Sequence, residues 1–257
     1  MRKTVFVTGA TSGFGKAIAS VFARNGYNLC ITGRREDRLH ALKQELELSY
    51  KVHVLTLCFD VRNRNDVEQA ITKLKQVYNT IDILVNNAGL AAGLSTIDEG
   101  DVDDWDTMID TNVKGLLYVT RQILPLMKGK GGHIFNIGST AAKLVYKNGN
   151  VYCATKFAVD ALNQAMRIDL LPYGIKVTAI HPGMAETEFS VVRFKGDEQR
   201  AASVYRGFEP LHAEDIANTV YYCATLPPHV CINDLTITCT NQANSAYTIK
   251  DAERINK

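Results

Sequence analysis

Tyr152 and Lys156 are the residues whose types and spacing could carry out proton transfer, and Ser139 lies a short way upstream. Tyr152 and Lys156 stand at positions i and i+4, so on a helix their side chains share one face. A free tyrosine titrates near pH ~10, and a nearby positive charge favours its phenolate form. The pair therefore has the chemistry of an acid–base couple, although its spacing alone does not predict one. A packed tyrosine beside a solvated lysine would have the same spacing, so the rest of the sequence must distinguish the two.

A glycine-rich loop near the N-terminus has the composition of a phosphate-binding turn. Residues 3–8 predict a buried strand, and apolar residues from Phe14 to Phe22 follow at helical spacing until Gly26. Between a strand and a helix, backbone N–H groups can receive a pyrophosphate that side chains would block. A plain tight turn is the alternative. The predicted cofactor contacts in this loop are Gly9, Thr11, Ser12, Gly13, Phe14 and Gly15.

The segment after the second predicted strand, residues 27–32, indicates which dinucleotide the loop would bind. About 20 residues past the loop, an acid would bond the 2′-hydroxyl of NAD, whereas arginine accommodates the 2′-phosphate of NADP. Gly33, Arg34 and Arg35 stand here, without an acid. We therefore predict NADP(H), with Arg34 as the stronger contact because it follows the small Gly33. Two solvated arginines at the start of a helix are the alternative.

Further polar segments follow the next predicted strands. Asp60 is placed to bond an adenine amino group or to cap the next helix, with Asn63 as the rival cap. The small residues of 86–89 would let a cofactor lie close to the backbone. Asn112 lies inside a long predicted helix, 105–128, where asparagine is unfavourable unless it holds a local distortion or a water molecule. The cofactor contacts predicted from these segments are Asp60, Val61, Asn87, Ala88 and Gly89.

The composition is that of an ordinary globular protein. The 257 residues carry a net charge of +2, with 46% apolar and 22% charged residues. This balance gives no basis for a nucleic-acid or membrane partner, and no apolar run reaches the ~18 residues needed to span a bilayer. The six cysteines show no metal-binding spacing. We therefore expect no metal site, reduced thiols and a cytoplasmic location.

Seven predicted strands alternate with helices, which indicates an α/β fold: a Rossmann-like, doubly wound parallel sheet with helices on both faces. No linker divides the chain, so we expect a single domain over residues 1–257. The segment 184–211 follows a strand end and is placed as a substrate lid. The polar tail 240–257 is expected to become ordered only on a partner. The remaining predicted strands are 52–58, 81–85, 133–138, 175–181 and 232–238, and the later helices are 36–48, 65–78, 151–171 and 213–225.

In this order and spacing, the motifs resemble the short-chain dehydrogenase/reductase family over nearly the whole chain. The resemblance implies that Tyr152 is the general acid–base and that Ser139 polarises the substrate carbonyl. It also implies that Lys156 binds the nicotinamide ribose and lowers the pKa of the phenol, and that Asn112 supports a water in the proton path. The matching segments are Thr8–Gly15, Asp60, Asn86–Gly89, Asn112, Ser139, Tyr152 with Lys156, and the predicted cofactor contacts Pro182, Gly183 and Thr187.

Within the family, residues 187–196 and 226–233 are similar to the NADP-dependent 3-hydroxy acid dehydrogenases, also called serine or L-allo-threonine dehydrogenases. Bacterial members also reduce malonic semialdehyde. This similarity implies a small-molecule substrate and a homotetramer built on helices 105–128 and 151–171. A 3-hydroxy acid needs a partner for its carboxylate, and Arg193 is the candidate because guanidinium binds carboxylate bidentately. The alternatives for this role are Lys143, Lys147 and Lys195.

Two other functions stay open on the sequence. One is the same chemistry on a steroid, sugar or acyl-carrier carbonyl, because substrate choice lies in loops and not in the fold. The other is an NADP-binding sensor without catalysis. An intact set of Ser139, Tyr152 and Lys156 argues against a sensor, which needs no acid–base group.

Overall fold

The computed structural model describes residues 2–253, which contain one sheet of seven parallel strands. Neighbouring strands follow the order β3-β2-β1-β4-β5-β6-β7, so the chain moves from β1 to one edge and then crosses back to build the other half. This crossover confirms the predicted doubly wound α/β fold. The strands are β1 (Thr4–Val7), β2 (Asn28–Gly33), β3 (Val54–Cys58), β4 (Ile83–Asn86), β5 (Gly132–Ile137), β6 (Ile175–Pro182) and β7 (Asp234–Ile237).

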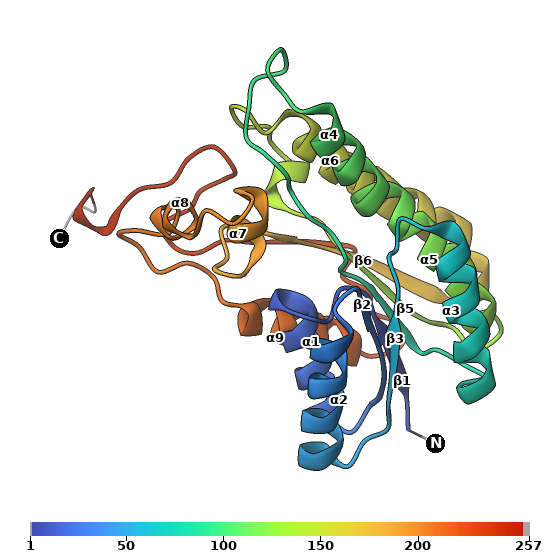
Figure 1. Ribbon diagram of the computed structural model, residues 1–257. Coiled ribbons are helices and arrows are strands. Elements are labelled where there is room, and N and C mark those ends of the chain that lie inside the picture. The colour runs from blue at the N-terminus through green and yellow to red at the C-terminus, as the bar shows by residue number, and fades with distance from the viewer. Residues whose placement is uncertain (1, 254–257) are drawn as a thin grey trace.

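Helices cover both faces of the sheet (Figure 1). The helices α1, α2 and α9 lie on one face, and α3, α4, α5 and α6 on the other. No described helix is long and apolar enough to cross a membrane. The helices are α1 (Gly13–Arg24), α2 (Glu36–Tyr50), α3 (Arg64–Val77), α4 (Val102–Ile109), α5 (Leu116–Ile123), α6 (Asn150–Leu170), α7 (Phe189–Arg193), α8 (Glu198–Ser203) and α9 (Ala213–Thr225).

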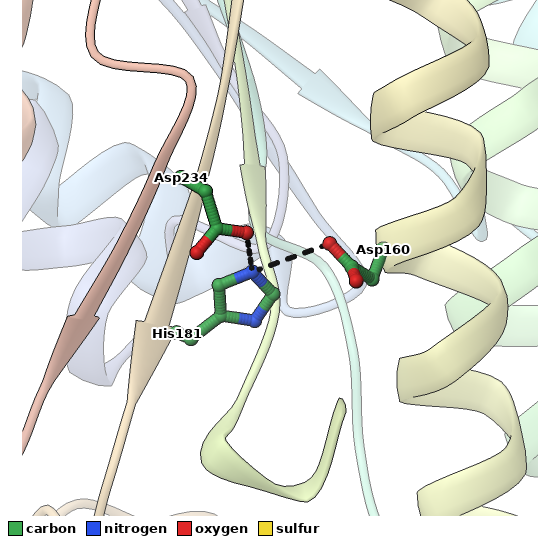
Figure 2. A group of neighbouring side chains, drawn as sticks. All are labelled: Asp160, His181 and Asp234. Carbon is green, nitrogen blue, oxygen red and sulfur yellow. Dashed lines mark hydrogen bonds and ion pairs between the residues drawn. The ribbon is translucent and has the colours of Figure 1, made fainter. Parts of the chain in front are cut away.

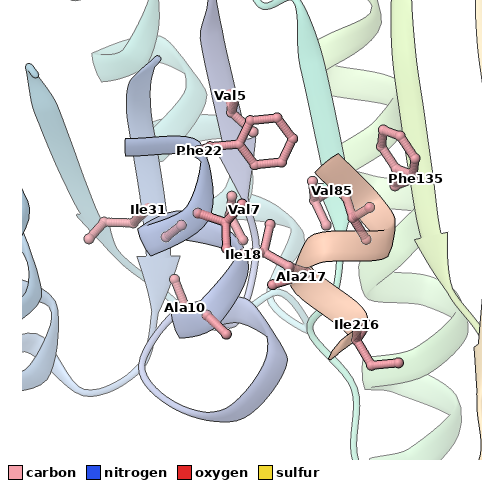
Figure 3. Packing of buried hydrophobic residues seen from close by; sticks show 14 of the residues in the cluster. Val5, Val7, Ala10, Ile18, Phe22, Ile31, Val85, Phe135, Ile216 and Ala217 are labelled. Atoms are coloured by element: carbon pink, nitrogen blue, oxygen red, sulfur yellow. The ribbon is translucent and has the colours of Figure 1, made fainter. Parts of the chain in front are cut away.

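The continuous apolar run of β1 is explained by burial on both faces of the sheet. Successive side chains of a strand point to opposite faces. Accordingly, Val5 and Val7 pack under α1 and α9, whereas Phe6 belongs to the cluster on the other face. Figure 3 shows Val5 and Val7 beside Ile18 and Phe22 of α1. The two apolar layers hold the carboxyl ends of the strands in place, and the loops that follow them form the site.

The long helix predicted over 105–128 is interrupted. It begins earlier, at Val102, and residues Asp110–Gly115 form a π-helical turn between α4 and α5. Asn112 lies inside this turn, so the local distortion anticipated from an asparagine in a helix is confirmed. A Cβ on Gly115 would come within 2.7 Å of the Val61 side chain, so the glycine lets the π turn pack against the loop after β3.

Two further differences concern the C-terminal third of the chain. The segment 184–211 contains two short helices, α7 and α8, rather than irregular chain alone. The expectation that the tail is ordered only by a partner is wrong for residues 240–253, because they pack against their own chain. Gln242 accepts a hydrogen bond from the Met184 N–H (2.7 Å), and Ser245 donates one to the Leu144 carbonyl. Residues 254–257 lie outside the described part of the chain.

Candidate active site

A cavity of about 480 Å³ opens at the carboxyl ends of the central strands and brings most of the predicted site residues together. Gly15 and Asn112 are the two predicted residues that do not line it. Gly15 faces Gly9, where a Cβ would collide with the carbonyl oxygen, and Asn112 is buried behind the wall. The predicted residues that line the cavity are Gly9, Thr11, Ser12, Gly13, Phe14, Arg34, Arg35, Asp60, Val61, Asn87, Ala88, Gly89, Ser139, Tyr152, Lys156, Pro182, Gly183, Thr187 and Arg193.

The glycine loop leaves bare backbone facing this cavity. Gly9 and Gly13 adopt φ values of +67° and +50°, which residues with a Cβ rarely adopt. The first turn of α1 contains no acidic residue, and its N-cap, Ser12, makes no side-chain capping bond. The helix N-terminus therefore presents N–H groups and a positive dipole end to the cavity. This cradle fits the pyrophosphate of a dinucleotide.

Arg35 and Arg34 both line the cavity, but they contact different residues. Arg35 donates to Thr11 Oγ1 (3.1 and 2.9 Å) and to Ser12 Oγ (2.9 Å) of the glycine loop. Its remaining donor contacts the carboxylate of Glu188 at 2.8 Å, which Arg38 also binds. Arg34 instead approaches Asp60 at 3.9 Å. An anion-binding position therefore exists at Arg35, and the Glu188 carboxylate contacts it.

The two roles considered for Asp60 are separated by the structure. Asn63 caps α3, because its side-chain oxygen accepts from the N–H groups of Asn65 and Asp66. Asp60 is thereby free of the capping role and lines the cavity, where Arg62 holds its carboxylate at 2.7–3.1 Å. Contact with adenine remains a prediction for Asp60.

Tyr152 and Lys156 share one buried face of α6, as their spacing predicted. Tyr152 is 8% exposed and Lys156 is 7% exposed, and both line the cavity. The Lys156 ammonium donates to the Ile137 carbonyl at the end of β5 (2.9 Å). Burial lowers the pKa of Lys156 to about 8. This lysine is therefore a positioned group with a titration close to neutral pH.

The expected lowering of the Tyr152 pKa by Lys156 is not observed. Burial is the largest effect on the phenol, and it raises the pKa of Tyr152 above its ordinary value. The Arg193 charge opposes this rise, as does a hydrogen bond with Ser139. The Arg193 guanidinium carbon lies 4.9 Å from the centre of the tyrosine ring, compared with 5.9 Å for the Lys156 nitrogen. The phenol is therefore neutral around pH 7.

Ser139 is placed beside Tyr152 by a short 3-10 turn, Thr140–Ala142, that follows β5. Its hydroxyl caps this turn by accepting from the Ala141 N–H (3.1 Å) and also hydrogen-bonds Tyr152. A hydroxyl acceptor keeps one O–H to donate, so Ser139 can still offer a proton to a substrate oxygen.

Asn112 connects the π turn to the loop after β4 and to α6. Its side chain pairs with both backbone groups of Leu90 (2.9 and 2.8 Å) and donates to Thr155 Oγ1 (3.0 Å). A Cβ on Gly89 would lie 3.2 Å from the Asn112 oxygen and 3.6 Å from the Lys156 nitrogen. Asn112 thus fixes the wall behind Lys156, while its contact with a water in the proton path stays a prediction.

Among the four candidate carboxylate partners, Arg193 is the one that lines the cavity. Its guanidinium lies against the rings of Tyr146, Tyr152 and Phe189 and hydrogen-bonds the Tyr146 hydroxyl. Its Nε is buried without a hydrogen-bond partner among the described residues.

The three lysine alternatives lie elsewhere. Lys143 pairs with Asp160 and Asp234, and Lys195 pairs with Asp101 and Asp104 at 3.2 and 2.9 Å. Lys147 is exposed and does not line the cavity. Arg193 is therefore the cation best placed to receive an anionic substrate.

Several cavity residues were missed in the sequence. Tyr146 holds Arg193, and its segment offered no motif that would identify it. Glu188 directly follows the predicted contact Thr187, so its place in the sequence could have identified it as a cavity residue. Gln242 and Ser245 come from the tail, which reaches the cavity through long-range packing that local sequence does not encode.

This parallel sheet, with its glycine cradle and its Ser-Tyr-Lys set, defines an oxidoreductase of the Rossmann type. Residues 3–198 match the model of the short chain dehydrogenase family, and the chain belongs to that family. It is 46% identical to the sulfoacetaldehyde reductase of Chromohalobacter salexigens, over 97% of this chain and 98% of that protein. It is 47% identical to the NADP-dependent 3-hydroxy acid dehydrogenase YdfG of Salmonella typhi, over 95% and 98%. The closed form of a serine dehydrogenase complexed with NADP+ superposes with a TM-score of 0.89, at 45% identity over 96% and 98%.

Proposed function

We propose that this protein is an NADP-dependent oxidoreductase that interconverts short 3-hydroxy acids and the matching 3-oxo acids or semialdehydes. The observation that carries the proposal is the half-buried Arg193 side chain, which lines the cavity with its guanidinium carbon 4.9 Å from the centre of the Tyr152 ring. A cation at this distance from the acid–base group suits a substrate whose anion and reacting carbon are close together.

The substrates named for the relatives share this geometry. In a 3-hydroxy acid, one carbon separates the hydroxyl-bearing carbon from the carboxylate, and in sulfoacetaldehyde one carbon separates the aldehyde from the sulfonate. Arg193 can pair two N–H groups with either anion. The likeness in substrate shape supports an anion-binding role for Arg193, with the reacting carbon directed at Tyr152.

The side chains divide the remaining chemistry between them. A nicotinamide held in this cavity would supply or accept the hydride. Tyr152, held neutral by burial, donates its proton to the carbonyl oxygen in reduction and accepts it back in oxidation. Ser139 donates a hydrogen bond to the same oxygen as negative charge develops there. Lys156 provides a positive charge at the inner end of the cavity, where the nicotinamide ribose is expected.

Initial rates with a panel of substrates test this proposal. Each of L-serine, 3-hydroxypropionate, a sugar alcohol and a hydroxysteroid is supplied with NADP+ or NAD+, and the absorbance of reduced nicotinamide is followed. We expect turnover of the two short acids with NADP+. Preferred turnover of the sugar alcohol or the steroid would favour another substrate class on the same fold.

For the cofactor, we infer that Arg35 contributes more than Arg34 to recognition of the 2′-phosphate. Arg35 contacts the glycine loop and already binds one anion, the Glu188 carboxylate, whereas Arg34 lies beside Asp60. Arg35→Ala is expected to lower the preference for NADP+ over NAD+ in kcat/KM by about tenfold or more, through loss of charge-assisted hydrogen bonds. Arg34→Ala is expected to have a smaller effect.

Arg38→Ala is the matched control for this comparison. Arg38 pairs with the same Glu188 carboxylate but does not line the cavity. The control should therefore leave the preference between NADP+ and NAD+ nearly unchanged. An equal drop for Arg35→Ala and Arg38→Ala would show that the Glu188 contact, and not the phosphate contact, sets the preference.

We further propose a homotetramer that uses the outer faces of α4, α5 and α6. Apolar side chains are exposed along these helices: Ile109 and Leu117 at 39% each, Phe157 at 42% and Ile168 at 75%. Exposed apolar residues gathered on one face are typical of subunit interfaces.

The six free cysteines support the proposed cytoplasmic location, where thiols stay reduced.

Replacing Phe157 and Ile168 together by glutamate is expected to dissociate the assembly. Buried carboxylates at an apolar interface lose hydration without gaining a partner. Light scattering coupled to gel filtration should then report a mass below four subunits. Leu48→Glu is the control, because Leu48 is 85% exposed on α2, away from these helices. A monomeric wild-type protein would contradict the proposal.

A further inference from the structure

A charged network centred on one buried histidine lies directly behind Ser139, outside the residues that would touch substrate or cofactor. Its centre is His181 near the end of β6, and two carboxylates approach the same ring nitrogen (Figure 2). His181 Nε2 lies 3.0 Å from Asp234 of β7 and 3.6 Å from Asp160 of α6. The His181 side chain is fully buried.

The other ring nitrogen of His181 faces the backbone of the catalytic serine. His181 Nδ1 is 3.4 Å from the Ser139 N–H nitrogen and 3.2 Å from the Ser139 carbonyl oxygen. A Cβ on Gly138 would collide with the imidazole, so the glycine lets the serine backbone lie on the ring. The position of Ser139 therefore depends on whether His181 Nδ1 accepts or donates a hydrogen bond.

The same carboxylates hold the far end of the serine turn. Lys143 ends the 3-10 turn that Ser139 begins, and its ammonium contacts Asp234 (2.7 Å) and Asp160 (3.1 Å). One oxygen of Asp234 thus binds both His181 and Lys143. Asp160 also stands one helical turn beyond Lys156 on α6, so the network joins the serine turn to the helix of the acid–base pair.

These carboxylates and His181 could also be considered as metal ligands, because their ligand atoms lie within 4.8 Å of one another. The Lys143 ammonium already lies between the two carboxylates, and a cation there would have to displace it. The arrangement is better suited to orienting the imidazole through hydrogen bonds.

We propose that His181 is a positioning residue for Ser139, which accepts the Ser139 N–H when neutral and releases the serine from its working position when protonated. The neutral ring makes two of these contacts in one tautomer: Nε2–H donates to Asp234, and the Nδ1 lone pair accepts from the Ser139 N–H at 3.4 Å, while the Ser139 carbonyl at 3.2 Å receives no proton from it. A second proton on Nδ1 turns this acceptor into a donor. The ring would then repel the Ser139 N–H and bond the Ser139 carbonyl instead.

The groups that face His181 determine where this change occurs. Burial is the largest effect and lowers the pKa of His181. Asp234 and Asp160 raise the pKa, whereas the Lys143 charge lowers it. Removal of a carboxylate and removal of the lysine should therefore shift the pKa of His181 in opposite directions. A merely structural role of the network would not produce opposite shifts.

The kinetic test, which rests on the proposed function, uses the reduction of a short 3-oxo acid by NADPH. In this direction Tyr152 acts as a neutral phenol, so its own titration does not reduce kcat at low pH. We expect kcat to fall on the acid side as His181 takes up a proton. Asp234→Asn should move this acid limb to lower pH, and Lys143→Met should move it to higher pH, each by about 1 pH unit. Shifts in the same direction, or none, would overturn the proposal.

Two substitutions at His181 itself separate positioning from folding. His181→Asn keeps an oxygen acceptor near the place of Nδ1 but cannot take up a proton in this range, so kcat should stay near the wild-type value and lose its acid limb. His181→Ala removes the acceptor, so kcat should fall about tenfold at neutral pH, and the acid limb should be lost because alanine takes up no proton. The dissociation constant for NADPH should be unchanged in both variants. An acid limb that persists in His181→Asn would contradict the proposal.

A spectroscopic measurement keeps the inference testable even if the proposed substrate is wrong. The protein is labelled with ¹⁵N-histidine, and the His181 signals among its six histidines are identified by their loss in His181→Asn. The proposal predicts the Nε2–H tautomer at neutral pH, with Nδ1 unprotonated. An Nδ1–H tautomer, or an imidazolium at neutral pH, would exclude it independently of any activity.

Discussion

Tyr152→Phe is expected to reduce kcat for oxidation and reduction by about a thousandfold, within the range measured for loss of a general acid–base group. The substitution removes the hydroxyl that exchanges a proton with the substrate and little else, because the ring remains packed near Phe189 and Arg193. The folded structure and the dissociation constant for NADPH should stay close to those of the wild type. Both are measured beside the rates, by thermal unfolding and by fluorescence titration.

The matched control for this substitution is Tyr146→Phe. Tyr146 also contacts Arg193 through its hydroxyl, but the hydroxyl that bonds Ser139 belongs to Tyr152. Tyr146→Phe should therefore weaken substrate binding and leave kcat within about tenfold of the wild type. Near-normal turnover in Tyr152→Phe, or an equal loss of kcat in both variants, would show that the proton passes through another group.

Arg193→Ala is expected to raise KM for L-serine by about 10- to 100-fold, which corresponds to the loss of a hydrogen-bonded charge pair. The KM of an uncharged alcohol such as 1-propanol should change little. Because the Arg193 charge also lowers the pKa of Tyr152, its removal should move the pH dependence of the oxidation toward higher pH. Initial rates over a pH series measure both effects.

Arg193→Lys separates charge from geometry in the same assay. It keeps a positive charge near Tyr152, so the pH dependence should stay close to that of the wild type, but it offers no planar pair of N–H groups. KM for L-serine should therefore lie between the values for the wild type and Arg193→Ala. Equal changes in KM for serine and 1-propanol in Arg193→Ala would remove Arg193 from carboxylate recognition.

The fold could be predicted from the local sequence because the apolar patterns, the glycine positions and the order of strands and helices all indicate the same architecture. Predicted strands and helices, apart from the interrupted 105–128 helix, differ from the observed ones by at most two residues at either end. Val5, Phe6 and Val7 form an unbroken apolar run because each face of β1 is covered, and burial on both faces is what such a run predicts. Asn112 stood out as a poor helix residue, and the π turn is the physical reason for its presence.

Properties that depend on long-range packing could not be predicted from the local sequence. Spacing predicted that Tyr152 and Lys156 share a face, but not that burial raises the pKa of Tyr152 or that Arg193 supplies the opposing charge. The sequence favours Arg34 by its position after Gly33, whereas in the structure the Arg35 side chain donates hydrogen bonds to the glycine loop. The contact between Gln242 and Met184 spans 58 residues, and the His181 network draws on β6, β7, α6 and the serine turn. Such contacts are fixed by the tertiary fold, which brings distant segments together.

The most direct test of the central claim compares 3-hydroxypropionate with its methyl ester as substrates of the wild-type protein and NADP+. The two molecules share the reacting carbon and differ in the charge that Arg193 would bind. We predict that kcat/KM for the acid exceeds that for the ester by about 100-fold. Equal values for the two, or a preference for the ester, would contradict recognition of short 3-hydroxy acids by this site.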